Sequence, residues 1–333
     1  MSTLTWLEAI VIGAVQGVAE LFPVSSLGHS ILIPAVVGGS WARDLDVSAP
    51  DSPYLAFIVG LHVATAIALI IYFRRDWVRI VRGFVTSIAR REVTEPDQRL
   101  AWLLVLATIP VGLVGLLLDH VFRVYLAKPV PTALFLALNG VILLAGEQAR
   151  KRRIALDEQQ SAADRESVAD REMAVATAGS GQHAAGQRAM KQQEASLAVQ
   201  SDRRLTRLGW LTAFGLGAAQ ILALLPGISR DGIVMVCGMF RGLSRQDAAR
   251  FSFLLSAPVI FAAGLLKVPD LTGPLGNGIR GQVLVGSIVS GVGAYLALRF
   301  FVRYISDSTR TLTPFAIYCL AAGLGSAIYL GIR

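Results

Sequence analysis

Long apolar tracts alternate with short polar segments along most of the chain. Six of these tracts approach the roughly 20 residues that a helix needs to cross a bilayer. They lie at about 54–73, 100–118, 131–148, 248–266, 281–302 and 313–331. Two further apolar tracts, at about 8–38 and 208–240, are interrupted by proline, glycine and polar residues. The pattern predicts an all-α polytopic membrane protein.

The two interrupted tracts are predicted to be re-entrant, each a helix–loop–helix that enters and leaves the membrane on one side. Pro23 and Gly28 break the first, and Pro226, Gly227 and Gly232 break the second. Non-helical backbone at membrane depth is stable only where it is buried in protein or lines a polar cavity. Two ordinary kinked spans are the alternative, but kinks alone do not explain why polar residues collect at both breaks.

The second part of the chain repeats the first at an offset of 204 positions. Each half contains one interrupted tract and three spans, and three crossings separate the two breaks, so the halves enter the membrane from opposite sides. This organisation predicts two inverted-topology repeats, in residues 1–150 and 206–333, whose broken helices meet near the midplane. Residues that coincide at this offset are Trp6 with Trp210, Gln16 with Gln220, Ser25 with Ser229 and Gly28 with Gly232.

Residues 151–205 differ from the rest of the chain. The segment is rich in alanine, glutamine, serine, glutamate and arginine and poor in aromatic residues. Such a composition buries too little apolar surface to offset the entropy of ordering. We expect a cytoplasmic linker between the repeats that is mainly disordered, with some fluctuating helix.

Composition and charge agree with a membrane protein. Hydrophobic residues make up 54% of the chain and charged residues 16%, against about 45–50% and 25% in soluble domains. The net charge of +8 comes from basic residues that cluster after the first, third and fifth spans, as expected of cytoplasmic loops. This distribution places both termini outside and argues against nucleic-acid binding. The two cysteines, Cys237 and Cys319, lack metal-site spacing.

The first break carries a group of polar residues suited to phosphoryl transfer. Gln16 and Glu20 are four residues apart and share a helix face. If the second half-helix starts near Ser26, that hydroxyl and His29 point the same way and form a minimal nucleophile–base pair. Free amide groups at the start of that helix, near Ser25, favour an anion.

The second break adds a positive charge. Arg230 follows Ser229 where another half-helix should begin, and a guanidinium matches phosphate geometry. Phosphoryl transfer depends mainly on positioning and charge neutralisation, for which Glu20, Ser26, His29 and Arg230 form a suitable set.

Each of these residues also has a structural interpretation. Ser25 and Ser26 can cap the new helix, and His29 can be a hydrogen-bonded packing residue. Arg230 can pair only with Asp231 or Glu20, while Gln16 and Gln220 can form interhelical hydrogen bonds. His62, inside the first full span, is predicted to have a structural role rather than a catalytic one. Asn139 and Glu147, near the third span, are predicted to be packing or interfacial groups. No nucleotide-binding or zinc motif is present in the sequence.

Two stretches resemble the hallmark motifs of the undecaprenyl pyrophosphate phosphatases, also called bacitracin-resistance proteins. They are residues 20–29, Glu-Leu-Phe-Pro-Val-Ser-Ser-Leu-Gly-His, and residues 226–232, Pro-Gly-Ile-Ser-Arg-Asp-Gly. The similarity extends to 251–258 and 313–318, and so to nearly the whole chain except the linker.

The resemblance implies an inner-membrane enzyme that converts a C55 polyprenyl diphosphate to the monophosphate carrier reused in cell-wall synthesis. It also implies interlocked inverted repeats, a site opening toward the outer side, and a divalent cation, Mg²⁺ or Ca²⁺, for which Glu20 is the candidate ligand. The family's acidic pair falls on Gln16 and Glu20, its serine and histidine on Ser26 and His29, and its arginine on Arg230.

Three positions depart from the common pattern of the family. Gln16 stands where many relatives have glutamate, which weakens any model with two carboxylates on one metal. Leu27 replaces a commoner threonine, and Asp231 replaces a commoner serine. Asp231 could orient Arg230, help to hold a cation, or repel the diphosphate.

The sequence thus predicts a membrane phosphatase in which Ser26, assisted by His29, attacks the terminal phosphorus. Histidine as the direct nucleophile remains open, as does Glu20 as a cation ligand or as the residue that orients His29. Ser25, Gly28, Ser229, Gln16 and Gln220 are expected around the diphosphate. The rival interpretation is a lipid-phosphate flippase or transporter, because broken inverted repeats also build transporters.

Overall fold

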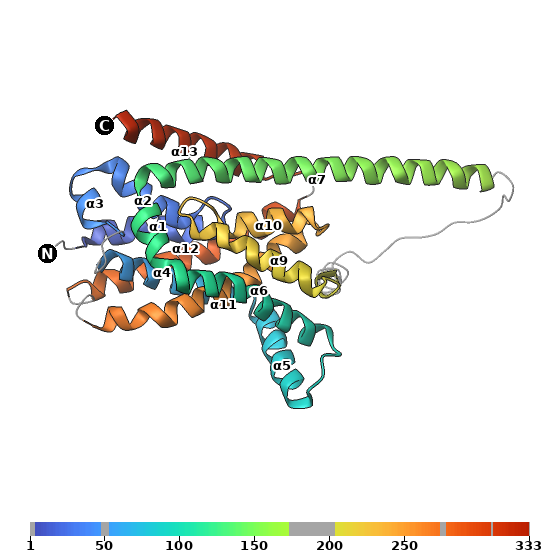
Figure 1. Ribbon diagram of the computed structural model, residues 1–333, viewed down its shortest axis with the longest axis horizontal. Helices are drawn as coiled ribbons and strands as arrows, with labels where there is room; N and C mark the ends of the chain where they lie inside the picture. Colours follow the sequence, from blue (N-terminus) through green and yellow to red (C-terminus); the bar gives the residue numbers. More distant parts are fainter. Residues whose placement is uncertain (1–3, 48–52, 173–203, 274–277, 308, 333) are drawn as a thin grey trace, which may run out of the picture.

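The computed structural model describes residues 4–47, 53–172, 204–273, 278–307 and 309–332, and in these residues the regular secondary structure is entirely helical (Figure 1). The first half contains α1 (Trp6–Leu21), α2 (Ser26–Val37), α3 (Gly39–Asp44), α4 (Pro53–Tyr72), α5 (Arg74–Arg90), α6 (Pro96–Val121), the π-helical turn η1 (Phe122–Leu126) and α7 (Pro129–Glu172). The second half contains α9 (Trp210–Ala219), the 3₁₀ segment η2 (Gln220–Leu224), α10 (Arg230–Phe240), α11 (Arg245–Thr272), α12 (Arg280–Ser306) and α13 (Thr313–Ile332).

Six helices are long and apolar enough to cross a membrane, as the sequence predicted. The candidate spans are Tyr54–Tyr72, Pro96–Leu118, Pro129–Leu156, Arg245–Gly264, Arg280–Ser306 and Thr313–Ile332. Each overlaps one predicted tract, so the all-helical polytopic class is confirmed. Both termini of the chain lie at the same end of the helix bundle (Figure 1).

Both interrupted tracts are broken at their prolines, Pro23 and Pro226, and at Gly227, whereas Gly28 and Gly232, also predicted to break them, lie inside the first turns of α2 and α10. The first is α1 followed by α2, with the chain extended at Phe22 and Ser25 in a left-handed conformation, φ 67°. The second is α9 and η2 followed by α10, with Gly227 at φ 112°. Positive φ is costly for a residue with a side chain, so Ser25 is held there by its surroundings.

Each broken helix packs against a span of the opposite half. Helix α1 lies along α12, and α9 lies along α6. Glycine makes this close approach possible, because a β-carbon at Gly17 would overlap the carbonyl oxygen of Ser290, and one at Gly217 would overlap that of Ala107. Small residues at such crossings are typical of helix packing in membranes. The two halves are therefore interlocked.

Helix α5 was not predicted. Its sequence was interpreted as a basic cytoplasmic loop, but it forms a helix from Arg74 to Arg90 that projects away from the bundle (Figure 1). Its buried face consists of Ile80, Gly83 and Ser87. These residues are three and four positions apart, which is the spacing of one helix face, although the segment is rich in arginine. A loop assignment based on charge alone missed this period.

The linker also differs from expectation over its first part. Helix α7 continues to Glu172, into the segment expected to be mainly disordered. Residues after Leu156 are rich in alanine, glutamate, glutamine and arginine, which have high intrinsic helix propensity. This explains how the helix extends beyond its apolar part. The remainder of the predicted linker, 173–203, lies outside the described residues.

Candidate active site

The two breaks contact each other directly. The hydroxyl oxygen of Ser25 accepts a hydrogen bond from the backbone amide of Gly227, at 3.2 Å, across more than 200 residues of sequence. A β-carbon on Gly28 would lie 3.0 Å from the α-carbon of Gly227. The loops before α2 and α10 therefore lie side by side, and the half-helices that follow them begin at a shared point.

Asn139, on α7, connects the two breaks. Its Nδ2 donates to the carbonyl oxygen of Pro23 at 2.9 Å, and its Oδ1 accepts from the backbone amide of Ser229 at 3.0 Å. Asn139 is completely buried. One amide side chain thus satisfies a buried acceptor in one break and a buried donor in the other, which fixes their relative position.

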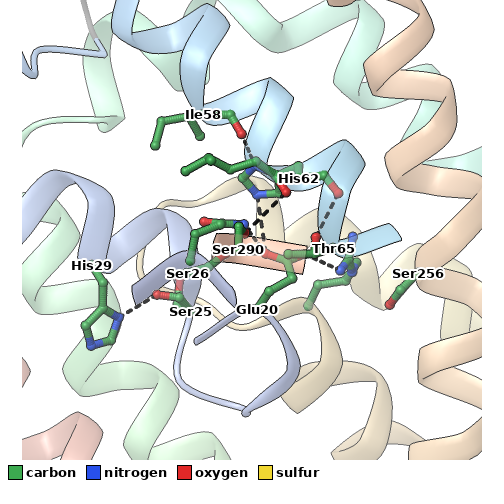
Figure 2. Close-up of polar contacts among 12 residues, drawn as sticks. Glu20, Ser25, Ser26, His29, Ile58, His62, Thr65, Ser256 and Ser290 are labelled. Carbon is green, nitrogen blue, oxygen red and sulfur yellow. Dashed lines mark hydrogen bonds and ion pairs between the residues drawn. The ribbon is translucent and has the colours of Figure 1, made fainter. Parts of the chain in front are cut away.

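Glu20 is the centre of the polar cluster at this point (Figure 2). Its Oε1 accepts a hydrogen bond from Arg230 at 2.7 Å, and its Oε2 accepts from the Ser26 hydroxyl and from Gln16 Nε2, the latter at 2.9 Å. The Glu20 side chain is only 5% exposed. Because a carboxylate only accepts hydrogen bonds, three donors around it indicate the ionised form.

His62, on α4, completes the cluster. Its Nε2 lies 3.3 Å from Oε2 of Glu20, and its Nδ1 lies 2.8 Å from the carbonyl oxygen of Ile58 (Figure 2). Both neighbours accept hydrogen bonds, so each ring nitrogen must carry a proton for both contacts to be favourable. In this arrangement one carboxylate lies between two cations, Arg230 and His62.

Asp231 is turned away from the cluster. Its Oδ1 accepts hydrogen bonds from Ser252 at 2.8 Å and Ser256 at 2.7 Å, both on α11. The Nε of Arg230 lies 3.7 Å from the same oxygen but forms no hydrogen bond to any of the described residues. Asp231 therefore helps to orient the guanidinium and leaves one of its donors available.

A small polar cavity of about 150 Å³ lies next to these side chains. Its lining includes Glu20, Ser26, His62, Gln220 and Arg230, so residues from both halves of the chain face one space. One water molecule needs about 10–15 Å³ of such space, so the cavity is large enough for several waters or for a small polar group.

His29 does not join the cluster. Its Nδ1 lies 2.7 Å from the carbonyl oxygen of Ser25 (Figure 2). Its Nε2 lies 2.6 Å from the hydroxyl of Tyr318 on α13. Both ring nitrogens are therefore occupied away from Ser26. Residues three apart on a helix are offset by about 60°, and here the imidazole turns toward α13 while Ser26 faces α1. The structure does not form the predicted Ser26–His29 pair.

The other predicted residues lie at the site, several of them in structural contacts. The Ser25 and Ser229 hydroxyls cap α2 and α10 by accepting from the amides of Gly28 and Gly232. Gln220 donates to the carbonyl of Ala107 at 3.2 Å. The predicted contacts of Ser25, Gly28, Ser229, Gln16 and Gln220 with phosphate oxygens stay predictions.

The donor atoms do not fit a resident divalent cation on Glu20. Both of its oxygens already accept from positively charged or hydrogen-bonding groups. Within the described residues there is no group of three or more histidine, cysteine, aspartate or glutamate side chains that could hold a metal. A cation at Glu20 would have to displace the guanidinium of Arg230.

The structure places His62 and Asn139 at the site. Asn139 is a buried, hydrogen-bonded residue, in line with the packing role predicted for it, whereas the contact between His62 and Glu20 was not predicted. Each is a strongly polar side chain within an otherwise apolar span, and such residues are by default functional candidates. That signal was available. What the sequence could not show is which way each side chain points.

Taken together, the fold and site define a polytopic membrane protein with a buried, charged cavity between two broken helices. Comparison with known proteins gives its family. The family model for bacitracin resistance protein BacA matches residues 9–325, and the chain belongs to that family.

Curated relatives match over nearly the entire chain. A protein of Mycolicibacterium paratuberculosis named undecaprenyl-diphosphatase is 58% identical over 330 residues, covering 99% of each chain. Undecaprenyl-diphosphatase 1 of Frankia casuarinae is 49% identical over 372 residues, covering 100% of each. Undecaprenyl-diphosphatase 2 of Chromobacterium violaceum is 37% identical over 327 residues, covering 97% of this chain and 98% of the relative.

Proposed function

We propose that this protein is an integral-membrane phosphatase that hydrolyses undecaprenyl diphosphate to the monophosphate and phosphate. The observation that carries the proposal is the hydrogen bond from the Ser26 hydroxyl to Glu20, in a cavity that also contains Arg230. A nucleophile, a base and a phosphate-binding cation are thereby in one space. The names of the relatives supply the lipid, and bacitracin resistance is the expected consequence of the activity.

In the first step the Ser26 oxygen attacks the terminal phosphorus of the diphosphate. The hydroxyl proton passes to Glu20, which already accepts its hydrogen bond, and the P–O bond to the lipid phosphate breaks. The lipid monophosphate leaves and a phosphoserine forms. In the second step water attacks that phosphorus and the bond to Ser26 breaks. Glu20 returns its proton to the Ser26 oxygen, and the phosphate leaves with the oxygen and protons of the water. Glu20 thus takes the base role that the sequence assigned to His29.

Arg230 and His62 are proposed to neutralise the diphosphate. Both cations contact Glu20 in the structure, and Arg230 has an additional donor at Nε. The N-termini of α2 and α10 begin beside this cavity, since Ser26 and Arg230 line it, and the positive end of a helix dipole favours an anion. Preorganised positive charge in a site of low dielectric constant is the main contribution that a phosphoryl-transfer enzyme makes.

We further propose that the two halves are inverted repeats, as expected from the sequence. Support comes from matched packing, since α1 lies along α12 of the second half and α9 lies along α6 of the first. Ser25 and Ser229, which coincide at the offset of 204, are both helix caps. With the basic segments inside, both termini face outward, and we propose that the site opens toward that side, as the family resemblance implies.

The test is phosphate release from undecaprenyl diphosphate by purified protein in detergent. Ser26→Ala is expected to lower kcat at least 1,000-fold. The matched control is Ser30→Ala, on the same helix, where the buried hydroxyl has no hydrogen-bond partner among the described residues. Near-normal release by Ser26→Ala would refute the assignment. A carrier without hydrolytic activity would release no phosphate in detergent, so the same assay separates the flippase alternative.

A further inference from the structure

An apolar groove of about 490 Å³ lies between α5 and α6 and extends to α11. Its walls include Trp77 and Phe84 from α5, Leu104, Gly112 and Leu116 from α6, and Pro258 from α11. Its polar side chains are the indole group of Trp77 and the hydroxyl of Thr108. The Thr108 hydroxyl donates to the carbonyl of Leu104 at 2.9 Å. The groove therefore suits a hydrocarbon.

The groove and the polar cavity are lined by adjacent positions of the same two helices, α6 and α11. Val111 and Val259 line the polar cavity, and their chain neighbours Gly112 and Pro258 line the groove. The two spaces therefore lie on neighbouring faces of α6 and of α11, because successive residues of a helix are about 100° apart. A molecule with a charged head in the cavity can place the carbon chain attached to that head in the groove.

We infer that this groove binds the isoprenoid tail of the lipid diphosphate, in the part nearest the head group. The inference rests on the proposed function, because the head must occupy the polar cavity. The lining positions on α6 run from 101 to 116, which is about 22 Å at 1.5 Å per residue. Exposed Ile109, Leu113 and Leu116 leave the groove open along its side, so the lipid enters from the bilayer and the rest of a long tail stays among lipid chains.

The inference can be tested by substituting Gly112, which lines the groove. A β-carbon built at Gly112 meets nothing within 4 Å, so a larger side chain there extends into open space without displacing the helix. Leucine also has higher helix propensity than glycine. Gly112→Leu should therefore fold normally and obstruct the groove beside the polar cavity.

The experiment compares kcat/KM for undecaprenyl diphosphate with kcat/KM for a five-carbon isoprenyl diphosphate, which is too short to fill the groove. We expect Gly112→Leu to lower the ratio of the long to the short substrate at least tenfold, and Gly112→Phe to lower it further. The matched control is Gly325→Leu on α13, where a β-carbon also meets nothing within 4 Å. It should leave the ratio unchanged.

A second apolar cavity provides a competing path. It is lined by Ala14, Phe22 and Ile33 together with His29 and Tyr318. If Ala14→Leu lowers the ratio and Gly112→Leu does not, the tail lies in that cavity and the inference is overturned. An unchanged ratio in both variants, with the wild type still hydrolysing both substrates, also overturns it and leaves the proposed function intact. Failure of the wild type to hydrolyse either diphosphate refutes the function itself.

A binding measurement independent of turnover uses an isoprenyl diphosphate with a photoreactive group in its second or third isoprene unit. Crosslinks are expected on residues 101–116 of α6 or on the inner face of α5. Crosslinks confined to α1, α2 and α13 would contradict the groove assignment.

Discussion

Neutralising Glu20 is expected to lower both the catalytic rate and the stability of the protein. Removing the proposed nucleophile, Ser26, is expected to lower mainly the rate. Glu20→Gln keeps the shape of the side chain but removes the charge between Arg230 and His62, whose side chains are 16% and 24% exposed. Leaving a buried charge unpaired costs about 3–5 kcal/mol, and losing a general base costs about 10²–10⁴-fold in rate. Ser26→Ala removes one of several donors to Glu20, with a cost in stability of about 1–2 kcal/mol.

The assay is unfolding in mixed detergent micelles, followed by tryptophan fluorescence, alongside phosphate release. We expect Glu20→Gln to lose at least about 1 kcal/mol more of unfolding free energy than Ser26→Ala, with both nearly inactive. Combining Glu20→Gln with Arg230→Gln should cost less than the sum of the single variants, by about 1–3 kcal/mol. Equal stabilities for Glu20→Gln and Ser26→Ala, with additive effects in the double variant, would refute the paired cluster.

Three further predictions concern the groups around Glu20. Asn139→Leu leaves one carbonyl and one amide of the two breaks unpaired and should destabilise the protein by about 2–4 kcal/mol, measured by the same unfolding assay; a change below 1 kcal/mol would contradict the connecting role. His62→Gln should lower kcat/KM at least tenfold through loss of a positive charge, whereas His120→Gln, exposed at the end of α6, should not; similar activities for the two variants would argue against His62. Because the oxygens of Glu20 are already bonded, Mg²⁺ or Ca²⁺ alone should not shift the thermal unfolding of the substrate-free protein, and a saturable shift lost in Glu20→Gln would show that a resident site exists.

The spans and the breaks could be predicted because their signals are local. A 20-residue apolar tract has few alternatives to a transmembrane helix, and proline and glycine mark where a helix cannot continue. The first full span, predicted at 54–73, is α4 from Pro53 to Tyr72, and α2 begins at Ser26 as expected. Arg230 likewise begins α10.

The partners of the site residues could not be predicted, because they depend on side-chain direction. Helix α4 is apolar on all sides, so its sequence gives no indication that His62 faces Glu20. His29 has the spacing for a pair with Ser26, but its imidazole bonds to a carbonyl one turn back and to Tyr318. Spacing along one helix shows which residues share a face only to within about a quarter turn. The partner that each side chain meets depends on contacts with residues far away in the sequence.

The order of synthesis gives the ion pair between Glu20 and Arg230 a consequence for biogenesis. The carboxylate emerges from the ribosome 210 residues before the guanidinium that neutralises it, and all three candidate spans of the first half are synthesised in between. An ionised group at membrane depth is costly until it is paired. The nascent first half must therefore hold this acid protonated, hydrated or beside His62 until the later helices arrive. Insertion of the second half then completes the neutralisation and locks the earlier helices in place.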